Sequence, residues 1–111
     1  MKQNCIFCKI INKEVPVTLL QETDDIIVIK DISPKAPIHN LIIPKKHIEN
    51  VADVQPEDAS IFGKLFLAAQ DLAKQNKISD FRLVINNGKN AGQSVFHLHL
   101  HFLAGKQMLD L

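Results

Sequence analysis

The feature that most constrains this chain is residues 92–103, GQSVFHLHLHFL, where three histidines alternate with apolar residues. Successive side chains of a β-strand point to opposite faces, so a strand here would carry His97, His99 and His101 on one face. Neighbouring rings on that face would lie roughly 6 to 7 Å apart. A solvent-exposed face is one alternative, although such a face usually mixes Lys, Thr, Glu and Ser. The other interpretations are metal ligation and acid, base or nucleophile chemistry near neutral pH.

The remaining pattern predicts an α+β fold in a single domain over residues 1–111. Apolar spacing indicates a short helix near the N-terminus and a long amphipathic helix that begins at Pro56 and ends near Asn76. Alternation and turn residues predict about five strands in a mainly antiparallel sheet. The expected order is a helix at 5–12, two strands turning around Asp24 and Asp25, a strand at 38–43, the long helix, a strand at 81–86 and the histidine strand.

Charge and hydropathy narrow the class of protein. Lys and Arg number 13 and Asp and Glu number 12, so the near balance gives no electrostatic reason to bind nucleic acid or an anionic membrane. Lys2, Lys9 and Lys13 interrupt the apolar start, which argues against a signal peptide, and no apolar run is long enough to span a membrane. We therefore expect a cytoplasmic protein whose cysteines are reduced thiols or metal ligands.

The segment before the histidines, NNGKNAGQS, indicates an anion site. Amide N–H groups of Gly92, Gln93 and Ser94 could form a small concavity for a phosphate, which would then lie beside the imidazoles. The alternative is a plain hairpin turn at Asn87 and Gly88 that binds no ligand.

Three segments together resemble a known family. HLHLHFL matches the H-x-H-x-H pattern of the histidine-triad (HIT) superfamily, and DISPKAPIHNLIIPKKHI and NNGKNAGQSVFHLHLH closely resemble its HINT-like branch of purine nucleoside phosphoramidases. The similarity covers residues 5–108. It implies a HIT-like fold and a homodimer in which two sheets join into a continuous one.

The resemblance also implies catalytic roles. His99 would be the nucleophile that forms a nucleotidyl-histidine, because a neutral imidazole attacks phosphorus well and leaves a labile adduct. His101 would contact phosphate oxygens, and Ser94 would hydrogen-bond the leaving group. His39 would support the nucleophile from the neighbouring strand; its alternative is a core histidine bonded to a carbonyl.

Nucleotide contacts follow from the same resemblance. Asp31 would bind the ribose hydroxyls and Asn86 would lie near the sugar and phosphate, while the amides of Gly92, Gln93 and Ser94 would stabilise charge on the phosphoryl group. An apolar slot for the purine would be formed by Ile6, Phe7, Ile10, Ile32 and Leu41. Taken alone, each of these five apolar residues is more typical of plain core.

The implied activity is hydrolysis of AMP–N or GMP–N bonds in nucleoside phosphoramidates, without an organic cofactor. Hydrolysis of dinucleoside polyphosphates is the alternative within the superfamily. A nucleotide-binding regulatory module is the alternative of another class.

Cys5 and Cys8 form a C-x-x-C motif, which on its own could be redox-active, zinc-binding or incidental. No thioredoxin-like pattern surrounds it, which argues against a redox pair. Zinc requires about four ligands, and His47 and His97 can supply the other two, a set that resembles one found in bacterial members of the family. We expect this zinc to be structural, because four protein ligands leave no open position.

Overall fold

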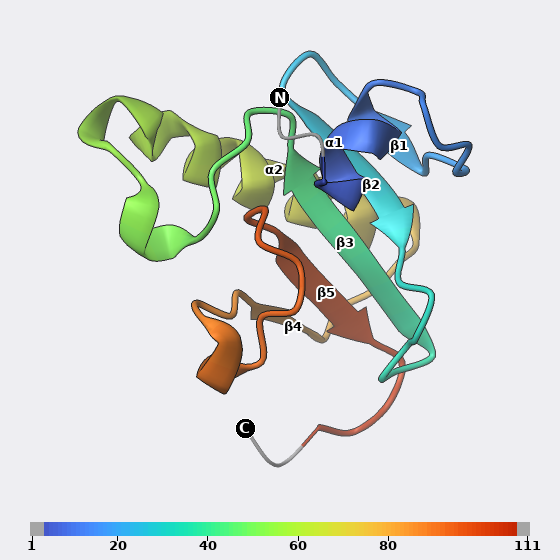
Figure 1. Ribbon diagram of the computed structural model, residues 1–111. Coiled ribbons are helices and arrows are strands. Elements are labelled where there is room, and N and C mark those ends of the chain that lie inside the picture. Colours follow the sequence, from blue (N-terminus) through green and yellow to red (C-terminus); the bar gives the residue numbers. More distant parts are fainter. Residues whose placement is uncertain (1–3, 109–111) are drawn as a thin grey trace.

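The computed structural model describes residues 4–108 and contains a five-stranded antiparallel sheet between two helices (Figure 1). The strands lie in the order β1-β2-β3-β5-β4. The elements follow the predicted chain order, which confirms the α+β architecture: α1 (Ile6–Ile11), β1 (Gln21–Glu22), β2 (Ile26–Lys30), β3 (Ile38–Pro44), α2 (Ala59–Gln75), β4 (Phe81–Val84) and β5 (Leu100–Ala104). Single-turn 3₁₀ helices at Val51–Asp53, Pro56–Asp58 and Lys89–Ala91 lie in the connections.

One face of the sheet packs against α2. Because β3 and β5 pair Ile42 with Leu100 and Asn40 with Phe102, Ile42, Leu100 and Phe102 share this face, and all three are fully buried. Leu65 and Leu72 of α2 pack into the same apolar cluster. Burying a side chain of this size stabilises a fold by roughly 1.5–3 kcal/mol, so this cluster fixes the helix on the sheet.

The opposite face carries α1 and the histidines. Leu41 pairs with His101, and His39 pairs with Leu103, so these side chains share the face that lies away from α2. Phe7 and Ile10 of α1 cover part of this face in a second apolar cluster. The short helix begins at a Cys5 cap, where Sγ accepts a hydrogen bond from the Cys8 amide at 3.3 Å.

The histidine strand is shorter than predicted. β5 begins at Leu100, so His97 and His99 precede it and only His101 lies within the strand, which corrects the expectation of one strand bearing all three imidazoles. The physical reason is a set of bonds to the end of β3 and the segment after it: Nε2 of His97 donates to the Pro44 carbonyl at 2.7 Å, and the Leu98 amide donates to the Ile48 carbonyl at 2.7 Å. These bonds bury the His97 ring completely.

Two other element ends also differ from the prediction. The long helix begins at Ala59, because Pro56–Asp58 forms a 3₁₀ turn in which Asp58 accepts a hydrogen bond from the Gln55 amide at 3.2 Å. β4 ends at Val84, two residues before the predicted end. Among residues 4–108, none of the helices has the length and apolar character needed to cross a membrane.

Candidate active site and metal site

A cleft of about 380 Å³ lies on the histidine-bearing face. The loop before β3, the loop after β4 and the strands β3 and β5 all contribute to its lining. Six of the predicted site residues meet there: Asp31, His39, Asn86, Gly92, Ser94 and His101. The topology therefore brings together residues that are up to 70 positions apart in the sequence.

His99 adjoins this cleft and has one fixed tautomer. Its Nδ1 lies 2.8 Å from the carbonyl oxygen of His97, and because a carbonyl only accepts, Nδ1 carries the proton and Nε2 keeps its lone pair. The ring is 8% exposed and contacts those of His101 and Phe7, with centroids 5.0 and 5.1 Å away. Burial lowers the pKa of His99, so the ring is neutral and can act as a nucleophile at pH 7.

His39 contacts His101 directly. Nε2 of His39 lies 2.9 Å from Nδ1 of His101, and Oδ2 of Asp31 lies 3.3 Å from the same His39 nitrogen. Burial, and after it the neighbouring charges of His99 and His39, lowers the pKa of His101 to about 4. His39 was expected to support His99, whereas its ring contact in the structure is with His101, the third histidine of the motif.

Two of the three backbone amides predicted to bind an anion already donate hydrogen bonds within the loop that precedes the triad. The Gly92 amide donates to the Lys89 carbonyl at 3.0 Å, and the Gln93 amide donates to the Gly88 carbonyl at 3.1 Å. Gly92 adopts a φ of +104°, a conformation that favours glycine, and lies against the Asn86 side chain. Of the three residues of the expected concavity, Gly92 and Ser94 line the cleft, whereas Gln93 is buried.

The structure separates the five residues predicted for a purine slot. Phe7, Ile10 and Leu41 are buried in the cluster under α1, whereas Ile6 is 42% and Ile32 98% exposed. Ile32 directly follows Asp31, which lines the cleft. Neither Ile6 nor Ile32 is among the residues that line the cleft, and Ile6 lines a separate hollow that also includes Ser94.

A second group of side chains has the chemistry of a zinc site. Cys5, Cys8, His47 and His97 each offer one ligand atom, and these four atoms lie within 4.8 Å of one another. Nδ1 of His97 is 3.3 Å from Sγ of Cys5 and 3.1 Å from Nδ1 of His47, and Sγ of Cys8 is 3.2 Å from that His47 nitrogen. Because Nε2 of His97 donates to a carbonyl, its Nδ1 lone pair faces the cluster, as in metal-ligating histidines. Two thiols and two imidazoles match the donor set of tetrahedral zinc.

Asp31, His39 and His101 form another compact group, with ligand atoms also within 4.8 Å of one another. Here the hydrogen bond at the other ring nitrogen has the opposite polarity from that of His97, because Nδ1 of His39 accepts from the Lys35 amide at 3.0 Å. A neutral imidazole that binds metal through Nε2 carries its proton on Nδ1, where this amide N–H already points. The contact therefore disfavours His39 as a metal ligand and leaves its proton on Nε2.

Four residues that line the cleft were absent from the predicted set: Ser33, Lys35, Val84 and Leu103. Alternation offered a signal for Leu103, because it lies two residues after His101 on the same face. The contact made by Lys35 uses its backbone amide, for which the side-chain sequence carries no signal.

Comparisons with known proteins find a matching family model and relatives of similar length. Residues 4–110 match the family model described as "Scavenger mRNA decapping enzyme C-term binding". An uncharacterized HIT-like protein of Synechocystis sp. is 47% identical over 107 residues, which cover 96% of this chain and 94% of that protein. Protein HitA of Neisseria gonorrhoeae is 45% identical over 101 residues, covering 90% and 94% of the two chains. The solved structure of a HIT family hydrolase from Clostridium thermocellum superposes with a TM-score of 0.95 at 45% identity, covering 100% of this chain and 98% of that one.

Proposed function

The chain belongs to the histidine-triad superfamily, and from this premise we propose that it is a nucleotide-binding hydrolase that cleaves purine nucleoside phosphoramidates through a nucleotidyl-His99 intermediate. The observation that carries the proposal is the hydrogen bond from Nδ1 of His99 to the His97 carbonyl, which leaves a lone pair on Nε2 of a neutral ring. The relative from Clostridium thermocellum, named a HIT family hydrolase, supports the reaction class.

The proposed reaction has two displacements at phosphorus. Nε2 of His99 first forms a bond to the α-phosphorus, and the P–N bond of the substrate breaks with its electron pair going to the amine, which takes a proton from solvent. Water then attacks phosphorus, the bond to His99 breaks, and the nucleoside monophosphate leaves as the water proton passes to solvent. Histidine attack suits this substrate because it exchanges one P–N bond for another of similar energy.

The cleft residues have distinct parts in this proposal. Asp31 and Asn86 would hold the sugar, Ile6 and Ile32 would contact the purine, and Ser94 would hydrogen-bond the leaving group. Asp31 has one oxygen bonded to the Ser33 amide at 2.8 Å, so its carboxylate is already oriented before a ligand arrives. A preoriented group of this kind lowers the entropy cost of binding.

The test is hydrolysis of a fluorogenic adenosine 5′-phosphoramidate by the wild type and by His99→Ala, with trapping of nucleotidylated protein. We expect turnover and label on the wild type alone, while His99→Ala keeps AMP affinity within about tenfold. Equal loss of AMP binding and rate would contradict a nucleophilic role for His99. Faster release of AMP from dinucleoside polyphosphates would favour the alternative hydrolase, and tight AMP binding with no turnover would favour a regulatory module.

We also propose that Cys5, Cys8, His47 and His97 hold a structural zinc ion. The donor set and the orientation of His97 support this assignment. When bound, the metal would tie α1 to the segment that carries the triad, because its ligands come from both. Thiols remain available as ligands in a reducing compartment, so the proposed location is the cytoplasm.

A homodimer joined through β4 is the proposed assembly. β4 lies at one edge of the sheet, and an uncovered strand edge favours pairing with another strand. Beside this edge, a shallow groove between α2 and β4 is lined by Phe66 and Phe81, which are 51% and 38% exposed. Pairing of two β4 strands would cover these aromatic side chains and extend the sheet.

A further inference from the structure

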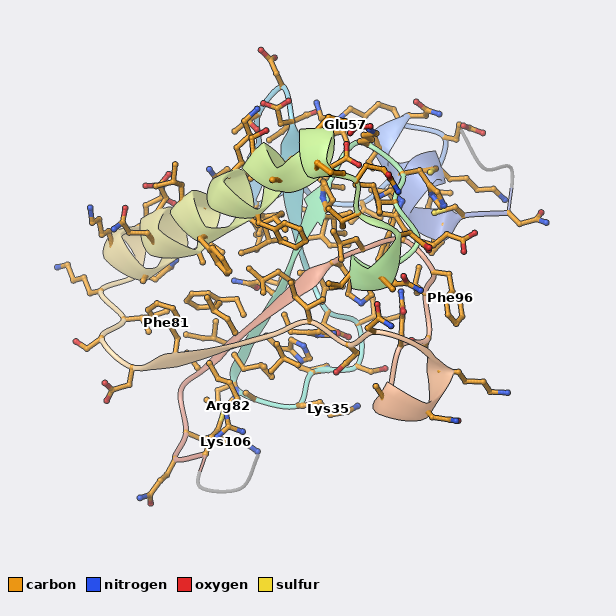
Figure 2. The ribbon with its side chains drawn as sticks, turned by 90° about the vertical axis from the view of Figure 1, so that its left-hand side faces the viewer. Lys35, Glu57, Phe81, Arg82, Phe96 and Lys106 are labelled. Carbon is orange, nitrogen blue, oxygen red and sulfur yellow. The ribbon has the colours of Figure 1, made fainter. Side chains whose placement is uncertain are left out.

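We propose that His39 is a positioning residue that fixes the tautomer of His101, so that His101 presents an Nε2–H donor to the substrate. The tautomer itself follows from hydrogen bonds in the structure, and its catalytic consequence rests on the proposed function. Lys35, whose backbone begins the chain of bonds, lies on the loop before β3, on the opposite side of the molecule from α2 (Figure 2).

The first step assigns the proton of His39. The Lys35 backbone amide donates to Nδ1 of His39 at 3.0 Å, and since an amide N–H only donates, this ring nitrogen must be unprotonated. His39 is 6% exposed, and burial lowers its pKa; the Asp31 charge opposes this effect and the Lys35 charge adds to it. A neutral ring with an unprotonated Nδ1 carries its proton on Nε2.

The second step transfers this constraint to His101. The Nε2–H of His39 has Nδ1 of His101 at 2.9 Å and Oδ2 of Asp31 at 3.3 Å, so the shorter bond goes to His101. Nδ1 of His101 is then an acceptor. Because the ring is neutral at pH 7, its own proton lies on Nε2, the nitrogen that does not contact His39.

Adjacent histidines of the triad therefore have opposite tautomers. His99 has its proton on Nδ1 and a lone pair on Nε2, whereas His101 has a lone pair on Nδ1 and its proton on Nε2. One ring can attack phosphorus while the next donates a hydrogen bond to a phosphoryl oxygen, which stabilises charge that develops in the transition state. A doubly protonated His101 would set its Nδ1–H against the Nε2–H of His39, so the same contact opposes a general-acid role for His101.

Two substitutions distinguish the effect of the hydrogen-bond donor of His39 from the effect of its side-chain volume. His39→Gln places a side-chain amide N–H near the position of the imidazole Nε2 and can still donate to His101, whereas His39→Met has similar length and no donor. The first readout is the tautomer of His101 at pH 7, measured by two-bond ¹⁵N–¹H correlation NMR. We expect the Nε2–H form in the wild type and in His39→Gln, and a mixture of tautomers in His39→Met.

The second readout is steady-state hydrolysis of the adenosine phosphoramidate. A mixture of tautomers leaves only a fraction of His101 with the Nε2–H donor, so His39→Met should lose roughly 2- to 10-fold in kcat with little change in KM, and His39→Gln should recover most of this loss. An Nδ1–H form of His101 in the wild type would overturn the proposal, as would equal kcat values for the two variants. Absence of turnover in the wild type would count against the proposed function, whereas the NMR measurement tests the tautomer independently and needs no variant to fold.

Discussion

Gln93 donates a hydrogen bond of 2.7 Å from Nε2 to the backbone carbonyl of Glu49. The same amide group donates to the Val95 carbonyl at 3.1 Å, and its Oε1 accepts from the Gly88 amide at 2.8 Å. The side chain is 3% exposed. It thereby joins the loop that precedes the triad to the segment that follows His47, one of the proposed zinc ligands.

Replacing Gln93 by Glu keeps the size and the acceptor but removes both N–H donors. The new carboxylate would face the carbonyl oxygens of Glu49 and Val95 inside the protein, where unsatisfied polar groups cost about 1–3 kcal/mol each. We expect the free energy of unfolding in urea to fall by at least this amount. Gln107→Glu, at an exposed position after β5, is the matched control and should change stability by no more than about 0.5 kcal/mol. Equal effects of the two substitutions would show that the Gln93 bonds contribute nothing to stability.

Zinc should co-purify with the protein in stoichiometric amounts. Chelation is expected to lower the melting temperature, because the proposed ligands connect α1 to the segment before β5. Cys8 is 1% exposed, and Cys8→Ser should lose the metal, as measured by elemental analysis.

His101→Gln is the control for the zinc measurement, because His101 belongs to the other compact group of potential ligands. The proposed assignment requires that this variant retain its zinc. Loss of zinc from His101→Gln together with its retention in Cys8→Ser would move the metal to the Asp31 group and contradict the tautomer assigned to His39.

Local sequence signals predicted the framework well where a single element determines its own boundaries. Pro37 directly precedes β3 and Pro44 is its last residue. The helical spacing of apolar residues, which includes Leu65 and Leu72, predicted which side of α2 is buried. The start of β5 could not be predicted from such local signals. It depends on the bond from Leu98 to Ile48, which joins residues 50 positions apart and leaves no local pattern.

The site shows a similar division. His39 and His101 line one cleft, because β3 and β5 are neighbouring strands. Core and ligand-binding surfaces both require apolar residues, however, so the sequence could not distinguish buried Phe7 from exposed Ile32. The Lys35 amide bond to His39 was equally inaccessible, because every residue except proline carries the same donor.

The proposed dimer can be tested at the groove between α2 and β4. Phe66→Glu should convert the protein to monomers, since a charge at an apolar contact must lose its hydration when the interface forms. Val51→Glu is the control, because Val51 is also exposed, at 41%, and lies in the 3₁₀ turn Val51–Asp53, which does not line the groove. Light scattering coupled to size-exclusion chromatography measures both. A monomeric wild type, or dimers that persist in Phe66→Glu, would contradict the assigned interface.

Stability should fall as the pH is lowered from about 6.5 to about 4. In this range the unfolded chain protonates His101 at its ordinary pKa, whereas burial keeps the pKa of the folded residue at about 4. The unfolded state then binds more protons than the folded state, so the free energy of unfolding rises with pH across the window and its contribution from His101 is complete above about 6.5.

His101→Gln removes this titration while keeping a polar side chain of comparable length. Urea unfolding at several pH values should therefore show a shallower slope between about pH 4 and 6.5 for the variant than for the wild type. Acid loss below about pH 4 should persist in both proteins, because Glu22 retains a pKa lowered to about 2 by hydrogen bonds to Lys13 and Lys45. The stabilisation from Glu22 is present above the ordinary carboxyl pKa and is lost as the pH falls toward 2. Because Glu22 is the same in both proteins, a difference in slope above pH 4 reports the substitution of His101. Identical slopes above pH 4 would mean that His101 titrates in the folded protein as it does in the unfolded chain.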